Sequence, residues 1–447
     1  MWCSAALCSL NRWDSLGARA TCGIPRRPHP EESMARPARQ LAALAVTMAF
    51  GISQGGNLSL SQGLGQAELG IELDGKKLFE KETFGGNGRT CQTCHSKRTG
   101  TLTLDDVQRT LEKPDPDDPF LIHDALDDDG VGTTRVQTHA TIRYTIPLPP
   151  WISMGDDPGA THVTVFRGIP STRNTPALDP ILLHDGRAPT LQQQALDAIH
   201  DHYQNAVEPT AAQLDAIAAF QQTNAHFFSS NELRRFGAGG PPPELPPGRT
   251  PAEQRGRTFL VDAPFTPPSK NGICALCHGG PMLNMVNQAH SDFVGGRPRP
   301  GVRFFNTGVT IVNQPNNPIR TWIINDGINP VVTVRSPDVG LVLHPNPPTP
   351  PPSIFPRAFF AEQFKIPTLW GVKDTAPYFH DNGAKTLRDA VAHYQRFFNF
   401  TEAQDPVGSL SLGGLIVLTD DDVDDIVAYL KRLGPNGEIT SRVDRTR

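Results

Sequence analysis

Residues 271–280 read NGICALCHGG, in which Cys274, Cys277 and His278 form a Cys-x-x-Cys-His motif. A disulfide between cysteines this close in sequence closes only a very small ring and joins no distant parts of the chain. In covalent c-type haem, by contrast, every residue of the motif has a role. The two thiols form thioethers to the vinyl groups, and the following imidazole ligates the iron.

A second copy of the motif lies in residues 90–96, TCQTCHS, and consists of Cys91, Cys94 and His95. Zinc ribbons separate their Cys-x-x-Cys pairs by about 15 to 20 residues, far less than the spacing between these two copies. A thiol redox pair explains neither the histidine nor the duplication. We therefore predict two covalently bound c-type haems, with one histidine as the proximal ligand of each iron.

Residues 1–64 are expected to form a leader region. Met34 opens the stretch MARPARQLAALAVTMAFGI, where two arginines precede an apolar run at residues 41–52. This run is shorter than the roughly 20 residues of a membrane-spanning helix and suits a secretory signal, with an N-terminal membrane anchor as the alternative. The remaining three cysteines precede Met34, which suggests that translation starts there. We expect a periplasmic protein that does not span the membrane after signal cleavage.

The remainder of the chain has the composition of a folded two-domain protein. Of 447 residues, 38% are hydrophobic and 19% are charged, so two cores can be buried. The net charge of -5, without a basic stripe, argues against a nucleic-acid partner. A Pro- and Gly-rich segment at 236–250 predicts a linker between an N-terminal haem domain, 65–235, and a C-terminal haem domain, 251–440.

Helical patterns predict a mainly α fold made of two cytochrome c-type domains with long irregular loops. Residues 209–223 and 418–434 carry apolar side chains at helical period, and the second stretch begins with acidic residues. Shorter amphipathic stretches precede both motifs, with Thr250 as the expected N-cap of the second. The Pro-rich stretch 344–357 predicts an exposed loop. The acidic run at 124–132 lacks the Glu that closes an EF-hand loop and is expected to be solvated.

These motifs resemble those of the bacterial di-haem cytochrome c peroxidases and their relative MauG, the tryptophan tryptophylquinone-forming enzyme. The resemblance covers nearly all of the mature chain. Besides the two haem motifs, it rests on RNTPAL (173–178), HDGRAPTLQQQAL (184–196) and FKIPTLWGVKDTAPYFHDNGAKTLRDAVAHY (364–394). It implies an oxidoreductase that reacts with hydrogen peroxide at the N-terminal haem. Electrons would pass through the C-terminal haem, near which a small redox protein or other electron donor docks.

The resemblance implies that Tyr394 is the distal ligand of the second haem, because the peroxidases have a methionine at this position and MauG has a tyrosine. Methionine ligation is otherwise hard to supply, since the last methionine, Met285, follows His278 too closely to fold across the ring. Leu387, Val391 and Tyr394 share one face of a predicted helix. Phenolate favours oxidised over ferrous iron. The alternative is a tyrosine packed in the core.

Two histidines lie near this position in the sequence. His393 is rotated by about 100° from Tyr394 around the predicted helix and is not expected to reach the same iron. His380, in PYFHDN, resembles a residue that the family requires near the second haem. We therefore expect a role in catalysis for His380 only.

The first haem departs from the family pattern at its distal side. The family's distal glutamine corresponds to Gln194, but the position of its catalytic glutamate is occupied by Gln204. An amide can hold peroxide by hydrogen bonds, whereas it cannot transfer the proton that O–O cleavage requires. His200, Asp201 and His202 are close enough in sequence to substitute, or the histidines are surface residues.

Two further expectations concern the same haem. His184 takes the place of the tryptophan that bridges the two haems in the family, so it is expected to lie on the path of electron transfer. The distal histidine found in some relatives has no clear equivalent, although His123 or His139 could fold back. We expect an open or water-bound first haem.

The resemblance also implies one calcium ion between the two domains. Its ligands would be the side chain of Asn174 and the backbone carbonyls of Thr375 and Pro377, which are the oxygen donors that calcium prefers.

Two other functional classes remain open from the sequence. An electron-transfer di-haem cytochrome without catalysis would need a strong sixth ligand on both irons. An oxygenase-type enzyme would use dioxygen at the same open first haem. Spectra that report the iron ligands distinguish the electron-transfer cytochrome from an enzyme. Reactivity with peroxide or with dioxygen distinguishes the oxygenase from a peroxidase.

Overall fold

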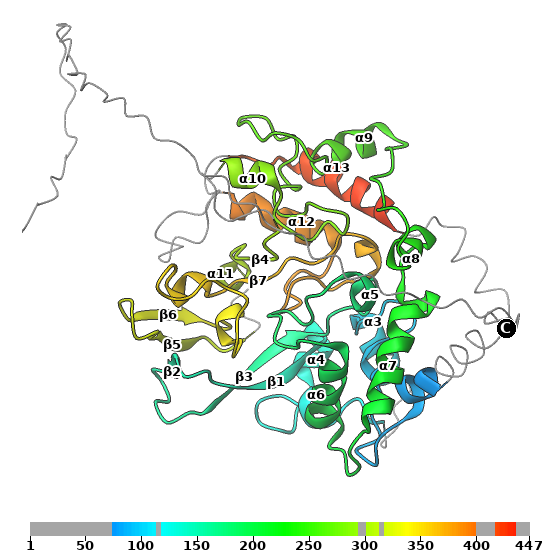
Figure 1. Cartoon of the computed structure of the whole chain (residues 1–447), viewed down its shortest axis with the longest axis vertical. Coiled ribbons are helices and arrows are strands. Elements are labelled where there is room, and N and C mark those ends of the chain that lie inside the picture. Colours follow the sequence, from blue (N-terminus) through cyan, green and yellow to red (C-terminus); the bar gives the residue numbers. More distant parts are fainter. Residues whose placement is uncertain (1–73, 113–117, 294–300, 313–316, 399–415, 435–447) are drawn as a thin grey trace, which may run out of the picture. The chain divides into compact units, whose positions relative to one another are not determined.

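The computed structural model describes residues 74–112, 118–293, 301–312, 317–398 and 416–434 (Figure 1). All of them belong to one compact unit, Ser59–Arg447. The predicted leader, including the apolar run at 41–52, lies outside the described residues. Within the described ranges, no helix combines the length and the apolar character needed to cross a bilayer.

The N-terminal half carries helices around the first motif. Residues 74–81 are helical, and α2 (Cys91–Cys94) contains the two cysteines. The further helices are α3 (Leu104–Glu112), α4 (Thr134–His139), α5 (Thr175–Leu178), α6 (Leu191–Tyr203), α7 (Ala211–Thr223) and α8 (Asn231–Gly237). Helices α6 and α7 pack against each other, and their buried side chains Ile199, Tyr203, Ile217 and Phe220 share a core with Phe79. This core lies beside Cys91, so it supports the motif directly.

The C-terminal half contains a second helical core. Its helices are α9 (Pro251–Thr258), α10 (Gln288–Phe293), α11 (Val309–Val312), α12 (Leu387–Phe397) and α13 (Asp420–Leu430). Helix α9 begins at the predicted N-cap, where the Thr250 side chain accepts a hydrogen bond from the Glu253 amide. It lies against α13, and α12 packs on the other side of α13 (Figure 1). Leu276, Val391 and Ile426 all belong to the core that these helices share.

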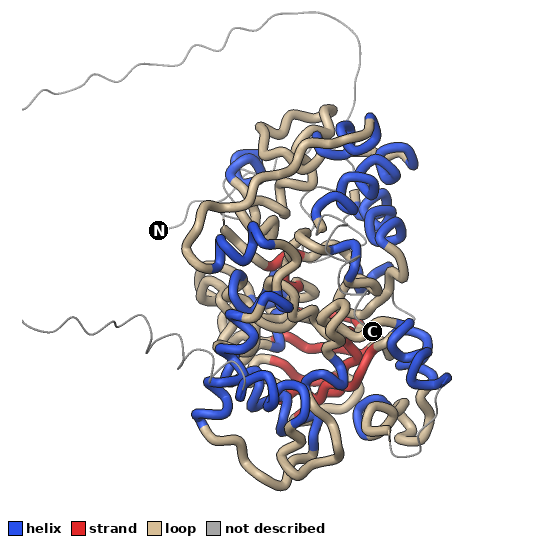
Figure 2. Tube along the Cα trace, turned by 90° about the vertical axis from the view of Figure 1, so that its right-hand side faces the viewer, coloured by secondary structure: helices blue, strands red, loops and turns tan. Residues whose placement is uncertain are grey.

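Short antiparallel strands lie between the helical regions, as Figure 2 shows in red. The antiparallel pair of β1 (Thr141–Pro147) and β3 (His162–Gly168) aligns Thr141 with Gly168. A three-stranded sheet has the order β2 (Ile152–Met154), β5 (Arg320–Ile324), β6 (Val332–Ser336), and β4 (Phe304–Phe305) pairs with β7 (Phe364–Lys365). Turns of 3-10 helix are η1 (His123–Ala125), η2 (Ala225–Phe227), η4 (Leu341–Leu343), η5 (Arg357–Phe360), η6 (Val372–Asp374) and η7 (Lys431–Leu433).

The mainly helical fold class predicted from the sequence is confirmed, with only short strands among the described residues. Helices α7 and α13 lie within the predicted stretches 209–223 and 418–434. Residues 344–356 contain no helix, as the prolines require. The strands were not predicted. The domain boundaries at 65–235 and 251–440 stay a prediction, and ion pairs such as Arg167 with Asp338 join the two halves.

The contact between α9 and α13 depends on the absence of a side chain at Gly256. A Cβ atom there would lie 1.9 Å from the Asp425 carbonyl oxygen. We expect Gly256→Ala to lower the free energy of unfolding by about 1–3 kcal/mol, because the helices must separate. Chemical denaturation followed by circular dichroism measures this change. Gly159→Ala is the matched control, since the nearest atom to its added Cβ is 4.0 Å away. Equal stability of the two variants would contradict the packing.

Candidate functional site

In the first motif, one ring nitrogen of His95 is held by a hydrogen bond and the other is left available to a ligand. The His95 amide donates to the Cys91 carbonyl at 3.0 Å, which folds the motif into a single turn. The ring Nδ1–H donates to the Gly100 carbonyl at 2.8 Å, leaving Nε2 as the available ligand atom. Burial lowers the pKa of His95, against the effect of the Gly100 hydrogen bond, so the neutral form is favoured. Neutral imidazole is the form that binds a metal.

The second motif repeats this arrangement in a segment of turns. The His278 amide donates to the Cys274 carbonyl at 2.9 Å, and Nδ1–H donates to the Leu283 carbonyl at 2.9 Å. Each ring is therefore oriented by a carbonyl five residues after it. Burial lowers the pKa of His278 as well. In both imidazoles the hydrogen bond at Nδ1 therefore leaves Nε2 as the nitrogen that can bind a ligand.

The four cysteines of the motifs are free and lack the electrostatics of reactive thiols. Burial raises the pKa of Cys91 to about 11 and those of Cys94, Cys274 and Cys277 to about 12. Redox-active and zinc-binding thiols need a stabilised thiolate, which these surroundings oppose. A neutral thioether suits them, so the donor set of two thiols and one Nε2 at each motif fits covalent haem.

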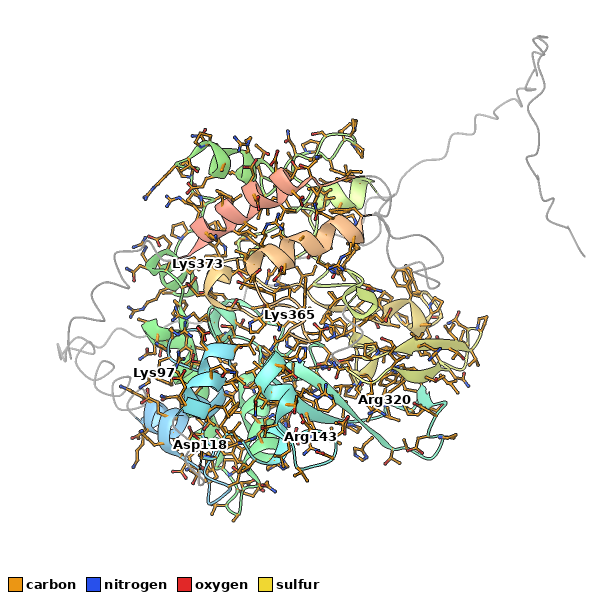
Figure 3. All side chains as sticks on the ribbon, turned by 180° about the vertical axis from the view of Figure 1, so that it is seen from behind. Lys97, Asp118, Arg143, Arg320, Lys365 and Lys373 are labelled. Carbon is orange, nitrogen blue, oxygen red and sulfur yellow. The ribbon has the colours of Figure 1, made fainter. Side chains whose placement is uncertain are left out.

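Each motif borders a cavity. The cavity at the first motif, about 120 Å³, is lined by Cys94 and His95, and the cavity at the second, about 290 Å³, by Cys274, Cys277 and His278. Lys365 on β7, labelled in Figure 3, also lines the second cavity and is held there by Asp179, 2.9 Å away.

One wall separates the two cavities. Five residues line both: Ile169, Pro170, Ser171, Thr175 and Leu183. The two candidate haem sites are therefore neighbours, divided by the chain that follows β3 and the chain that precedes α6.

His184 and His380 meet at this wall on the side of the second cavity. The Nε2–H of His184 donates to the Gly168 carbonyl at 3.0 Å, and its ring centroid lies 6.5 Å from that of His380. His380 stacks on Phe364 with a centroid distance of 3.6 Å. Burial lowers the pKa of His184 to about 4 and that of His380 to about 3. Both imidazoles are therefore neutral at ordinary pH.

Helix α6 supplies the polar wall of the first cavity. Gln194, Asp197, Asp201 and His202 line it, because spacings of three, four and seven residues recur on one helical face. Gln204 does not line either cavity. The helix ends at Tyr203, and Gln204 is its exposed left-handed C-cap, whose amide oxygen accepts a hydrogen bond from Asn87. The structure thus brings Gln194 to the cavity but leaves Gln204 outside it.

Tyr394 lines the second cavity together with Leu387 and Val391, in line with their shared helical face. Burial raises the pKa of Tyr394, and the nearby Cys277 and Cys274 add to the effect. His393 faces elsewhere, since its Nε2–H donates to the Thr307 carbonyl at 2.6 Å. Tyr378 lines the same cavity, but its hydroxyl donates to the Val372 carbonyl at 3.0 Å. Ligation by Tyr394 stays a prediction.

Two of the three residues predicted to bind calcium line the same cavity. Thr375 and Pro377 line the second cavity. Asn174 is fully buried, its amide oxygen accepts the Ser229 N–H at 2.8 Å, and its amide nitrogen donates to the Trp370 carbonyl at 3.0 Å. The side-chain oxygen expected to ligate calcium therefore already accepts a hydrogen bond. The calcium site stays a prediction.

The sequence analysis missed two charged residues near the first cavity. Asp124 was expected in a solvated loop, but it is 5% exposed and pairs with Arg89 and His202. Of the remaining acids of the run, Asp128 and Asp129 are exposed as predicted, whereas Asp127 is half-buried. The burial of Arg89 and its pairing with Asp124 could not be predicted from the sequence, because the two residues lie 35 positions apart.

Tyr394→Phe is expected to leave covalent haem attachment intact and to change the ferric optical and EPR spectra of one haem, because an anionic oxygen ligand is lost. Tyr429→Phe is the matched control. Its phenol is buried in the same core but donates to the Pro246 carbonyl at 2.7 Å and does not line the cavity. An unchanged spectrum in Tyr394→Phe would rule out the ligand assignment.

No protein-family model and no curated protein matches the chain. Solved structures do. A MauG-like protein associated with microbial copper homeostasis is 19% identical, with 83% of this chain and 90% of that chain covered and a TM-score of 0.44. The diheme peroxidase BthA from Burkholderia thailandensis is 16% identical, with 82% and 86% covered and a TM-score of 0.44. Hydrazine synthase from Kuenenia stuttgartiensis is 15% identical, with 88% and 99% covered and a TM-score of 0.35.

A MauG-like protein and a diheme peroxidase are thus among the solved structures to which this chain is similar over more than four fifths of its length. The positions of individual residues are those of this chain's own structure, and their roles stay proposals.

Proposed function

We propose that the protein is an exported, periplasmic di-haem c-type oxidoreductase that reacts with hydrogen peroxide at the first motif and exchanges electrons through the second. One observation carries the proposal. Each motif has its histidine oriented for a ligand and borders a cavity, and the two cavities share one wall. An enzyme that divides oxidant binding and electron exchange between two centres needs this proximity. The motif resemblance to di-haem peroxidases and MauG supports peroxide as the oxidant.

Cysteines and histidines of the motifs would hold the two groups, at Cys91, Cys94 and His95 and at Cys274, Cys277 and His278. Bound haem supplies the electrons for two-electron reduction of peroxide. The chain supplies binding and orientation. Gln194 lies on the polar wall of the first cavity, where its amide can donate a hydrogen bond to a peroxide oxygen.

Electron transfer between the sites would cross the shared wall near Leu183 and His184. Leu183 lines both cavities, and His184 lies on the second. A neutral imidazole packed near His380 offers a short path through bonded and contacting atoms. It does not offer the easily oxidised indole found at this position in the family. An electron donor or an oxidised substrate would dock near the second site, where Tyr394 is expected to favour the oxidised iron.

One observation favours a different class, an electron-transfer cytochrome without catalysis. His202 lines the first cavity together with His95, so its imidazole would be available to bind the iron of a haem held there. If each iron had six strong ligands, peroxide would have no position at which to bind. Dioxygen chemistry at an open first site is the other alternative, and reactivity toward the two oxidants distinguishes it.

Titration of the fully haem-loaded ferric protein with hydrogen peroxide tests the proposal. We expect near-stoichiometric peroxide to change the optical and EPR spectra of both haems, because the sites share a wall. Reaction only after one-electron reduction would indicate conventional peroxidase behaviour. Two low-spin irons that react in neither state would contradict the proposal and favour electron transfer. Reaction with dioxygen alone would favour the oxygenase class.

A further inference from the structure

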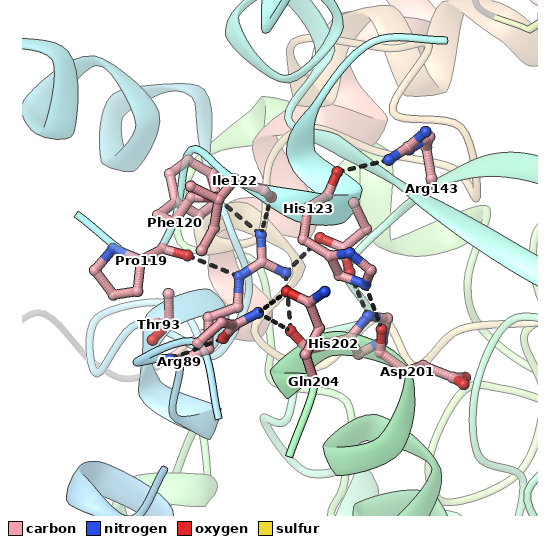
Figure 4. Close-up of polar contacts among 12 residues, drawn as sticks. Arg89, Thr93, Pro119, Phe120, Ile122, His123, Arg143, Asp201, His202 and Gln204 are labelled. Carbon is pink, nitrogen blue, oxygen red and sulfur yellow. Dashed lines mark hydrogen bonds and ion pairs between the residues drawn. The ribbon is translucent and has the colours of Figure 1, made fainter. Parts of the chain in front are cut away.

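A buried arginine beside the first motif organises the loop that precedes β1. Arg89 is 1% exposed, and its guanidinium donates to the backbone carbonyls of Pro119, Phe120 and Ile122, at 2.8, 2.9 and 2.6 Å (Figure 4). It also donates to the carbonyl of His202 at 3.4 Å. The same group forms an ion pair with Asp124. A guanidinium with this many fixed partners holds the carboxylate in one place.

Asp124 in turn orients the imidazole of His202. The Nδ1–H of His202 donates to Asp124 Oδ2 at 2.5 Å, from α6 to η1 across 78 positions of sequence. Burial raises the pKa of Asp124, but hydrogen bonds and charges from His202 and Arg89 outweigh it, and the pKa falls below its ordinary value. The carboxylate is thus ionised and can stabilise positive charge on the imidazole. The edge of the ring packs on Tyr144, with centroids 5.3 Å apart.

With Nδ1 engaged, Nε2 is the reactive atom of His202. The residue lines the first cavity with His95 and Gln194. The hydrogen bond that the His202 ring forms with the described residues uses Nδ1, and the side chain retains 16% exposure. An imidazole that is held by a carboxylate at one nitrogen and open at the other is the arrangement of a general base that later acts as an acid.

We propose that His202 is the catalytic residue that moves the proton when peroxide is cleaved at the first site, and that Asp124 and Arg89 are its positioning residues. The inference rests on the proposed function. His202 Nε2 accepts the proton from one peroxide oxygen and delivers it to the other. That second oxygen leaves as water with both protons and the electron pair of the broken O–O bond. A bound haem would supply the two electrons that the remaining oxygen needs, so atoms and charge balance.

Neighbouring candidates on α6 are less suited to this role. His200 is exposed and its Nε2 contacts Glu208 at 2.9 Å. Asp201 lines the cavity but is exposed and has no positioning cation within an ion-pair distance among the described residues. Gln194 carries an amide, which does not transfer protons. The titratable and charged groups that surround His202 are Asp124, Arg89, Asp201, Asp197, Tyr144, Arg187, His200 and, across the cavity, His95.

The test compares His202→Gln with His200→Gln in the ferric, haem-loaded protein. Peroxide reaction is followed by stopped-flow spectroscopy, and cyanide affinity gives a readout independent of turnover, because hydrogen cyanide must release its proton to an acceptor when it binds. We expect His202→Gln to slow the peroxide step by about 10²–10⁴-fold and to weaken cyanide binding by at least about tenfold. Its ligand-free ferric spectrum stays unchanged, and His200→Gln behaves as the unaltered protein.

Two outcomes would overturn the inference. Cyanide affinity and peroxide rate equal to those of the unaltered protein would show that His202 moves no proton. A change of the ferric spectrum from low spin to high spin, with tighter cyanide binding, would show that His202 is an axial ligand. If the unaltered protein does not react with peroxide, the proposed function fails, while the cyanide comparison still decides whether His202 accepts a proton.

Asp124→Asn separates positioning from a purely structural role. The amide retains the shape but not the negative charge that stabilises the imidazole when it takes up a proton from a bound ligand. Because hydrogen cyanide must give its proton to that imidazole, we expect cyanide affinity and the peroxide rate to fall in this variant while the ligand-free ferric spectrum stays unchanged. Cyanide affinity equal to that of the unaltered protein would remove Asp124 from the mechanism, even if the variant is less stable.

Discussion

The hydrogen bond from each motif histidine to a backbone carbonyl five residues later is the interaction on which the rest of the structure depends. Without it, the ring of His95 or His278 could rotate about its side-chain bonds, and either nitrogen could face the cavity. With Nδ1 bonded to Gly100 or to Leu283, the ligand atom is fixed before any group binds. The two motifs reach the same geometry from different backbones, one from a short helix and the other from consecutive turns. The carbonyl, rather than the helix, is therefore the shared requirement.

A buried ionic network holds the shared wall in place. Arg167, at the end of β3, pairs with Asp338 through two nitrogens, at 2.7 and 2.9 Å, and with Asp185 at 2.6 Å. Asp338 belongs to the C-terminal half, whereas Asp185 directly follows His184. Breaking a buried pair of this kind typically costs about 3–5 kcal/mol, since a charge is left without its partner. The network therefore fixes the position of the wall relative to both cavities.

Local pattern in the sequence predicted the motifs, the main helices and the face of α12. These features depend on residues a few positions apart. Gln204 illustrates the limit. Counting ten residues from Gln194 places a side chain correctly only if the helix continues, and here the helix ends one residue earlier in a left-handed cap. Asp124 illustrates a second limit of local pattern, because its burial depends on Arg89 and His202, which are distant in sequence. The pairing of β1 with β3 likewise joins strands that are separated in the chain by the segment containing β2.

The wall common to the two cavities means that five side chains serve two binding sites at once. A substitution at Ile169 or Leu183 changes the volume of both cavities. A side chain that improves packing against the group in one cavity therefore also alters packing in the other. The two centres cannot diverge independently along this surface. Adaptation of either site is therefore directed toward residues that border one cavity alone, such as those on α6 for the first and on α12 for the second.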